Sequence, residues 1–118
     1  SHTVTHPDLA CVTPQEAERE MWESKEMIQE RLGRPVEVFA YPYGKYAQWT
    51  VDLARRHFTG ACSTILGKAT SGDDPGLLPR VDMYYLSSQR LMESLDTRGM
   101  DWYLGLRQVF RVTKELFV

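Results

Sequence analysis

Cysteine is scarce in this chain of 118 residues, which has only Cys11 and Cys62. They lie far apart and do not form a C-x-x-C pair, which excludes a zinc ribbon and a thiol redox motif. Two isolated thiols are also too few for the disulfide scaffold of a small secreted domain. We therefore expect both cysteines to be small side chains that are buried or half-buried.

Long apolar runs and an excess of one charge are also missing. The longest apolar stretches contain only a few residues, whereas a membrane-spanning helix needs about 20, so we expect no membrane span. Lys and Arg total 14 against 16 Asp and Glu, a net charge of −2. The sequence contains no stripe of basic residues, so we do not expect it to bind nucleic acid. The first residue is not Met and no signal peptide is visible, so the sequence leaves the localisation unknown.

The chain does have the composition of a soluble globular protein, with 42% hydrophobic and 25% charged residues. Its length allows one domain at most. A helix begins at Thr13 and Pro14, because the first can cap the helix and the second suits its first position. Apolar residues then recur at helical spacing until Gly33 and Pro35, which predicts a helix over 14–32. These apolar positions are Ala17, Met21, Ile28 and Leu32.

Strand and helix patterns alternate after this first helix. Buried strands are predicted at 36–41, ended by Pro42, and at 60–66, with a helix over 46–58 between them. A polar, glycine-rich loop follows, and then a short strand after Pro79. Further helices are predicted at 87–95, capped by Ser87 or Ser88, and at 100–118. The alternation of helices with unbroken apolar strands favours an α/β fold with parallel strands.

Two histidines stand four residues apart in the opening stretch SHTVTHPDL. On a helical turn, residues i and i+4 share one face, so the imidazoles of His2 and His6 could converge on one divalent cation. Zinc chemistry also needs a third protein ligand and an open coordination position. A second candidate loop, YPYG (41–44), comes at the carboxyl end of the predicted strand 36–41, where α/β folds bind ligands.

These motifs resemble those of the polysaccharide deacetylases, the carbohydrate esterases with a NodB-homology domain. The stretch SHTVTHPDL is similar to their second motif, H-[S/T]-x-x-H, and FAYPYG (39–44) is similar to their third. The segment GDDPGLLPRVDM (72–83) resembles the poly-N-acetylglucosamine deacetylase-like branch. The likeness covers residues 1 to about 96. The motifs stand in the family's order, and one predicted helix lies between the second and the third.

The resemblance implies part of a distorted (β/α) barrel of the NodB-homology type. Residues 1–118 would be a single partial domain, its C-terminal portion, with the N-terminal strands missing. The implied activity is metal-dependent hydrolysis that removes acetyl groups, by N-deacetylation, from a sugar polymer or oligosaccharide.

The resemblance also implies roles for individual residues. His2 and His6 correspond to two ligands of the divalent metal, most often zinc, whose third ligand is an Asp. The backbone N–H of Tyr43 corresponds to the donor that holds the oxyanion. The substrate-binding loop corresponds to Tyr41, Pro42, Tyr43 and Gly44.

Three features depart from the family pattern. The first motif, T-F-D-D, supplies the catalytic base and the Asp ligand; it is absent from these residues, and the Asp-Asp pair Asp73-Asp74 lies in a later loop. Ala40 stands where an Arg often precedes the Pro-aromatic pair, and Arg80 is a candidate orienting residue in its place. The late catalytic His of the family is not found, and we expect His57 to be a basic residue in the last turn of a helix.

Two other functions stay open. One is a non-catalytic remnant of the same fold that binds carbohydrate or a partner. The other is a different metallohydrolase whose third ligand would be Asp73, Asp74 or Asp82. For the leading hypothesis we expect a fragment that is inactive alone, since it is shorter than the roughly 200 residues of a whole barrel and lacks the base. An incomplete barrel exposes strand edges and apolar faces, which predicts self-association.

Other residues have simple structural interpretations. Trp22, Trp49 and Trp102 occupy helical positions, where we expect them to pack against the core. We expect five glutamates of the first helix to form one solvated face: Glu16, Glu18, Glu20, Glu23 and Glu26.

Overall fold

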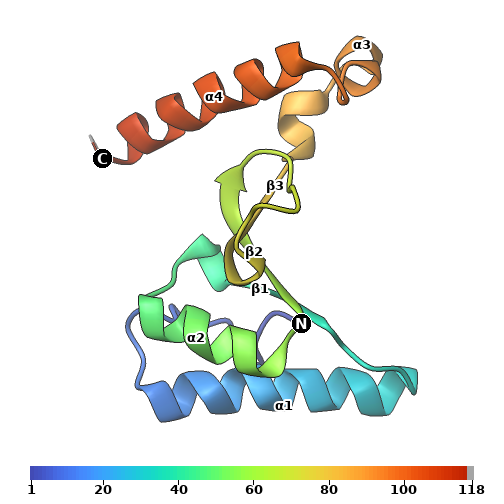
Figure 1. Cartoon of the computed structure of the whole chain (residues 1–118). Coiled ribbons are helices and arrows are strands. Elements are labelled where there is room, and N and C mark those ends of the chain that lie inside the picture. Colours follow the sequence, from blue (N-terminus) through green and yellow to red (C-terminus); the bar gives the residue numbers. More distant parts are fainter. Residues whose placement is uncertain (117–118) are drawn as a thin grey trace. The chain divides into compact units, whose positions relative to one another are not determined.

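A computed structural model describes residues 1–116 of the chain, and the surroundings of side chains up to residue 113. It divides into two compact units. The first comprises Ser1–Thr64 with Gly72–Leu78, and the second Ile65–Ser71 with Pro79–Val118. Each unit has an apolar core of its own, and Figure 1 traces the order of the elements along the chain.

Helix α1 spans Pro14–Leu32 and confirms the predicted helix. The Thr13 hydroxyl accepts a hydrogen bond from the Glu16 N–H at 3.3 Å, as a helix cap does. Gly33 ends the helix in the left-handed conformation, at φ +63°, where its N–H donates to Gln29 O at 2.8 Å. Glycine adopts this conformation without a steric cost, which explains why the helix stops there.

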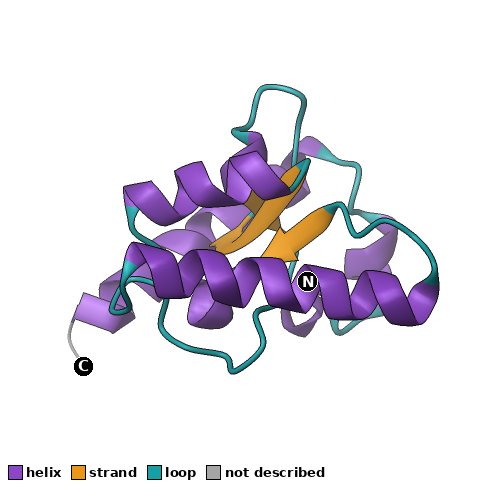
Figure 2. Ribbon diagram, turned by 90° about the horizontal axis from the view of Figure 1, so that it is seen from below, coloured by secondary structure: helices purple, strands orange, loops and turns teal. Residues whose placement is uncertain are grey.

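The first unit contains a parallel strand pair. Strand β1 (Val38–Ala40) pairs with β2 (Gly60–Leu66), with Phe39 opposite Ala61. Helix α2 (Gln48–His57) is the crossover between them, as a parallel pair requires. Figure 2 shows these strands among the helices. The predicted α/β fold with parallel strands is therefore confirmed.

The core of the first unit joins α1, α2 and the two strands, and α1 and α2 lie side by side (Figure 1). Phe39 of β1 stacks on Phe58, with ring centres 5.1 Å apart, and meets the Tyr41 ring edge-on at 5.3 Å. Burial of this apolar surface holds the helices on the strands. The other core residues are Leu9, Ala17, Met21, Val51, Leu53, Ala54 and Ala61.

The second unit is mostly helical. Strand β3 (Leu78–Arg80) completes a sheet of order β1-β2-β3. We predicted a strand after Pro79, but the strand includes this proline. An edge strand tolerates proline because only one of its two sides is hydrogen-bonded to a neighbouring strand. Helix α3 (Gln89–Glu93) is shorter than predicted, and Ser88 caps it. Helix α4 is Arg98–Leu116; residues 117–118 of the predicted last helix lie outside the described residues.

The core of the second unit is smaller. It is built from Leu66, Leu86, Met100 and Leu104. Trp102 of α4 is 72% exposed and Trp22 of α1 is 46% exposed, so the expectation of packing is wrong for these two and holds only for the partly buried Trp49. None of the described helices is long and apolar enough to span a membrane.

Candidate functional site

The residues around the two histidines form an irregular loop and not a helical turn. Thr3 and His6 have positive φ angles of +63° and +59°. A residue with a Cβ adopts this conformation rarely, and local strain of this kind costs of order 1–3 kcal/mol and clusters at functional sites. The loop therefore has to be held in place by its surroundings.

The edge of β1 positions His2. The Ser1 nitrogen donates to Val38 O at 2.7 Å, and Ser1 O accepts from the Ala40 N–H at 2.9 Å, so Ser1 lies beside β1 as a strand residue would. The Nδ1 atom of His2 is 2.7 Å from Ala40 O. A carbonyl oxygen only accepts, so Nδ1 carries the proton and Nε2 of the neutral ring presents a lone pair.

The two imidazoles converge in front of this edge. Nε2 of His6 is 3.0 Å from Nε2 of His2, and both side chains are exposed. Nitrogens this close must share a proton or face a common cation, since two lone pairs repel. Ligand nitrogens about 2.0–2.1 Å from a tetrahedral zinc are about 3.3 Å apart, so the pair fits two positions around one divalent metal. A ligating histidine commonly donates its other ring N–H to a carbonyl, as His2 does.

No third metal ligand among the described residues joins this pair. Among the residues that the structure describes, no group of three or more His, Cys, Asp or Glu side chains could hold a metal ion. Asp74 instead pairs with Arg55, whose guanidinium holds the pKa of that carboxyl below its usual value. Asp82 accepts a hydrogen bond from the Tyr84 N–H at 2.9 Å. The structure therefore does not form the three-ligand site with Asp73, Asp74 or Asp82 that a different metallohydrolase would need.

The second candidate loop, residues 41–44, is anchored in the core by its first two residues. Tyr41 is 2% exposed and Pro42 is also buried. The Tyr41 hydroxyl donates to Gly76 O at 2.7 Å, and burial raises the pKa of this phenol, which keeps it a donor. The Tyr41 ring therefore belongs to the core. The substrate-binding role of this loop stays a prediction.

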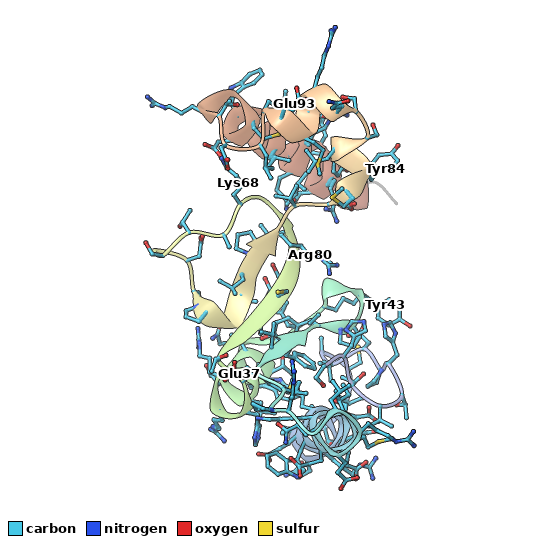
Figure 3. The ribbon with its side chains drawn as sticks, turned by 90° about the vertical axis from the view of Figure 1, so that its right-hand side faces the viewer. Glu37, Tyr43, Lys68, Arg80, Tyr84 and Glu93 are labelled. Atoms are coloured by element: carbon cyan, nitrogen blue, oxygen red, sulfur yellow. The ribbon has the colours of Figure 1, made fainter. Side chains whose placement is uncertain are left out.

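Of the last two residues of this loop, Tyr43 is exposed and Gly44 is half-buried. Tyr43, labelled in Figure 3, is 64% exposed and has a φ of +59°. Its ring meets the His6 ring edge-on, with centres 4.5 Å apart. Gly44 has a φ of +66°, and a Cβ atom there would overlap the Thr64 side chain, so the loop requires glycine at this position.

An ion pair joins the two loops. Lys45 Nζ lies 2.8 Å from Asp8 Oδ2. The hydrogen bond with Lys45 holds the pKa of Asp8 below its usual value, and the same bond raises the pKa of Lys45. Because Lys45 follows Gly44 and Asp8 closes the histidine loop, this pair helps to keep Tyr43 beside His6.

Glu20 is a functional candidate that the sequence interpretation missed. We expected it on a solvated face, but it is 4% exposed. Its Oε2 accepts from the N–H groups of Val4 and Thr5 at 2.7 and 2.8 Å, and its Oε1 accepts from the Thr5 hydroxyl at 2.8 Å. Burial alone would raise the pKa of Glu20, but these hydrogen bonds outweigh it and the pKa is lowered. The available signal was helical spacing, since residue 20 shares the buried face of Ala17 and Ser24.

Arg80 and His57 are two further candidate residues. Arg80 is exposed at the end of β3 and belongs to the second unit (Figure 3), so its orienting role stays a prediction. His57 ends α2, as predicted. Its Nε2 is 3.0 Å from Glu18 Oε1, and its ring lies 5.5 Å from that of Trp22. These contacts tie α2 to α1 and explain His57 without a catalytic role.

A family comparison covers both loops. Residues 1–59, which are half of the chain, match the family model described as polysaccharide deacetylase. This chain belongs to the polysaccharide deacetylase family. The matched stretch contains His2, His6, Glu20 and the 41–44 loop, so the two histidines, their supporting carboxylate and the loop beside them are all within the deacetylase match.

Individual deacetylases align with only part of their length. YxkH of Bacillus subtilis (strain 168), whose name assigns it to the polysaccharide deacetylases, is 32% identical over 56 residues, which are 48% of this chain and 20% of YxkH. The structure of the Streptococcus pyogenes deacetylase PplD in complex with acetate is similar, with a TM-score of 0.66 and 32% identity. That similarity covers 69% of this chain and 36% of PplD.

A second structure shares the fold alone. It is BA3943 of Bacillus anthracis, described as a CE4 family pseudoenzyme, with a TM-score of 0.50 and 24% identity over 52% of this chain and 22% of that protein. The α/β fold of this chain thus corresponds to part of the NodB-type deacetylase fold, as the motifs indicated.

Proposed function

We propose that this chain carries part of the active site of a metal-dependent enzyme that removes acetyl groups from a carbohydrate polymer. The observation that supports it most is the 3.0 Å approach of the His2 and His6 Nε2 atoms, beside Tyr43 and within the deacetylase match. His2 and His6 would hold a divalent metal, zinc by family resemblance. When bound, such a metal polarises an acetyl carbonyl and activates water.

The chain's own residues would orient the ligands and the substrate. The Ala40 carbonyl fixes the His2 tautomer that leaves Nε2 free to ligate. The 41–44 loop would border the substrate through Tyr43 and Gly44, with the Tyr43 N–H as the proposed oxyanion donor. Arg80 remains a candidate orienting residue. The substrate in this proposal is an acetylated sugar polymer or oligosaccharide.

The described residues provide two of the three expected ligands, and residues 1–118 do not contain the T-F-D-D motif to which the resemblance assigns the base. Loss of a positioned base alone typically costs about 10²–10⁴ in rate, so we propose that the 118-residue chain is inactive by itself. The small ligand set also favours one alternative, a non-catalytic domain of the same fold that binds carbohydrate or a partner.

Zinc titration of the chain by calorimetry tests the ligand pair. Weak binding is expected for the wild type, none for His6→Ala, and wild-type binding for His57→Gln, which changes a histidine outside the pair. Wild-type affinity in His6→Ala would contradict the proposed site. Zinc that stays near-stoichiometric through dialysis would contradict the two-ligand description.

Acetate release from chitin oligomers and poly-N-acetylglucosamine, with zinc or cobalt added, tests the activity. The 118-residue chain should release none, whereas a longer parent that includes an upstream Asp-Asp motif should be active, and its His6→Ala variant inactive. Rapid turnover by the 118-residue chain would contradict the fragment proposal. A folded, metal-loaded but inactive parent would favour the non-catalytic alternative.

A further inference from the structure

We propose that Glu20 is a positioning residue that holds the two histidines in their converging arrangement, an inference that rests on the proposed metal site. Glu20 touches neither imidazole in the described hydrogen bonds. It acts on Val4 and Thr5, which lie in the loop between His2 and His6.

The backbone of this loop forms a binding site for an anion. Two consecutive N–H groups, those of Val4 and Thr5, point to the same oxygen of Glu20. Such convergence is typical of a backbone nest, in which one residue near the paired amides is left-handed. Thr3, directly before Val4, has a φ of +63°. The anion that fills the nest is thus the chain's own buried carboxylate.

This anchoring reaches His6 through the backbone. Thr5 makes two hydrogen bonds to Glu20 and directly precedes His6, whose φ is +59°. The His6 N–H also donates to the Thr3 hydroxyl at 3.1 Å, which closes the turn. If the carboxylate is removed, the strained residues can relax to their preferred conformations and the imidazoles lose their 3.0 Å approach.

Helix α1 makes Glu20 a rigid anchor. Its neighbours on the buried face, Ala17 and Met21, belong to the core. On the next turn, the Ser24 hydroxyl lies 2.5 Å from that of Ser1. The same helical face therefore contacts the chain on both sides of His2, so the histidine loop is tied to the core at two points.

Four variants of the 118-residue chain separate positioning from simple stability. Glu20→Ala removes all three hydrogen bonds. Glu20→Gln can keep them, because the amide oxygen accepts from both N–H groups and the amide NH₂ can donate to the Thr5 hydroxyl. Glu23→Ala changes an exposed glutamate of the same helix. Met21→Ala weakens the core next to Glu20 without removing a bond to the loop.

Zinc affinity is the first measurement, with urea unfolding of each variant as the stability reference. Glu20→Ala should bind zinc about 10–100-fold more weakly, the typical effect of losing a group that orients metal ligands. Glu20→Gln should recover most of this loss, and Glu23→Ala and Met21→Ala should bind as the wild type does. The proposal is overturned if Glu20→Ala binds zinc as tightly as the wild type, or no more weakly than Met21→Ala.

NMR of the metal-free chain keeps this test separate from that of the proposed function. The wild type should show a nuclear Overhauser effect between the His6 and Tyr43 rings, whose centres are 4.5 Å apart. Glu20→Ala should lose it, and Met21→Ala should keep it. If the wild type binds no zinc, the proposed metal site fails. Glu20 is then judged on this signal alone, and an unchanged effect in Glu20→Ala overturns its positioning role.

Discussion

Replacement of Tyr41 by Phe tests the anchoring of the loop beside the histidines. The hydroxyl that is lost donates to Gly76 O at 2.7 Å, and the tyrosine is 2% exposed. The ring remains, so its edge-on contact with Phe39 at 5.3 Å and its contact with Tyr46 at 5.4 Å are kept. The substitution therefore isolates one buried hydrogen bond.

The expected loss of stability follows from that bond. A net hydrogen bond contributes about 0.5–1.5 kcal/mol, and a buried carbonyl left without its donor costs about 1–3 kcal/mol. Because the substitution removes the donor and leaves the acceptor, Tyr41→Phe should lower the free energy of unfolding by roughly 1–3 kcal/mol. Urea unfolding followed through the amide NMR signals of β1 and β2 reports this, because those strands belong to the core that contains Tyr41.

Tyr43→Phe is the matched control, since Tyr43 is in the same loop but 64% exposed. Its free energy of unfolding should stay within about 0.5 kcal/mol of the wild type, as for most surface substitutions. Equal effects of the two substitutions would refute the argument that the buried hydrogen bond anchors the loop.

The same pair of variants has a pH signature. Burial raises the pKa of Tyr41 in the folded chain, whereas an exposed phenol ionises near pH 10. Above about pH 10 the unfolded chain loses this proton first, so stability should fall as the pH rises. Tyr41→Phe should remove that part of the decline and Tyr43→Phe should keep it; parallel pH profiles for the two variants would contradict the assignment.

Other substitutions test the same loops. Gly44→Ala should lower the free energy of unfolding by more than the roughly 1–2 kcal/mol of a left-handed backbone, because the new Cβ overlaps Thr64. Gly33→Ala has open space around it and should cost only the backbone strain. Equal losses of stability on urea unfolding would contradict the close approach of Gly44 to Thr64. In an NMR titration the Asp8 carboxyl should have a pKa below its usual value, and Lys45→Met should raise it, since the Lys45 hydrogen bond is the main cause; no change would show that another group is responsible. The chain should self-associate at high concentration, because an incomplete barrel exposes apolar faces. A monomer by light scattering would contradict this prediction.

Local patterns were enough to predict most elements of this chain. The cap at Thr13, the stop at Gly33 and the periodic apolar residues between them define α1, because each acts within one or two helical turns. The alternation of α1, β1, α2 and β2 likewise favoured parallel strands, since a parallel pair needs a crossover between its members. The histidine and YPYG motifs were also visible as short stretches, although their conformation was not.

Other features depend on partners that are distant in the sequence. Glu20 looked like any glutamate of an amphipathic helix, and only the packed structure shows that its carboxylate accepts three hydrogen bonds from residues 4 and 5. Tyr41 could be predicted to end a buried strand, but only the structure shows that its hydroxyl donates to Gly76 O, 35 residues away. Such a polar group is buried only where its partner is present, and a local pattern does not contain that partner.

The order of helices and strands, and the two motifs that carry the deacetylase resemblance, could be predicted from the sequence because helix caps, apolar periodicity and residue identity are local. The tertiary structure decided that His2 and His6 converge through a left-handed loop, that Tyr43 lies against His6, and that a buried carboxylate supports the turn between the histidines. These arrangements depend on hydrogen bonds and ring contacts between segments that only folding brings together, and the strain at positive φ is tolerated because those contacts compensate for it.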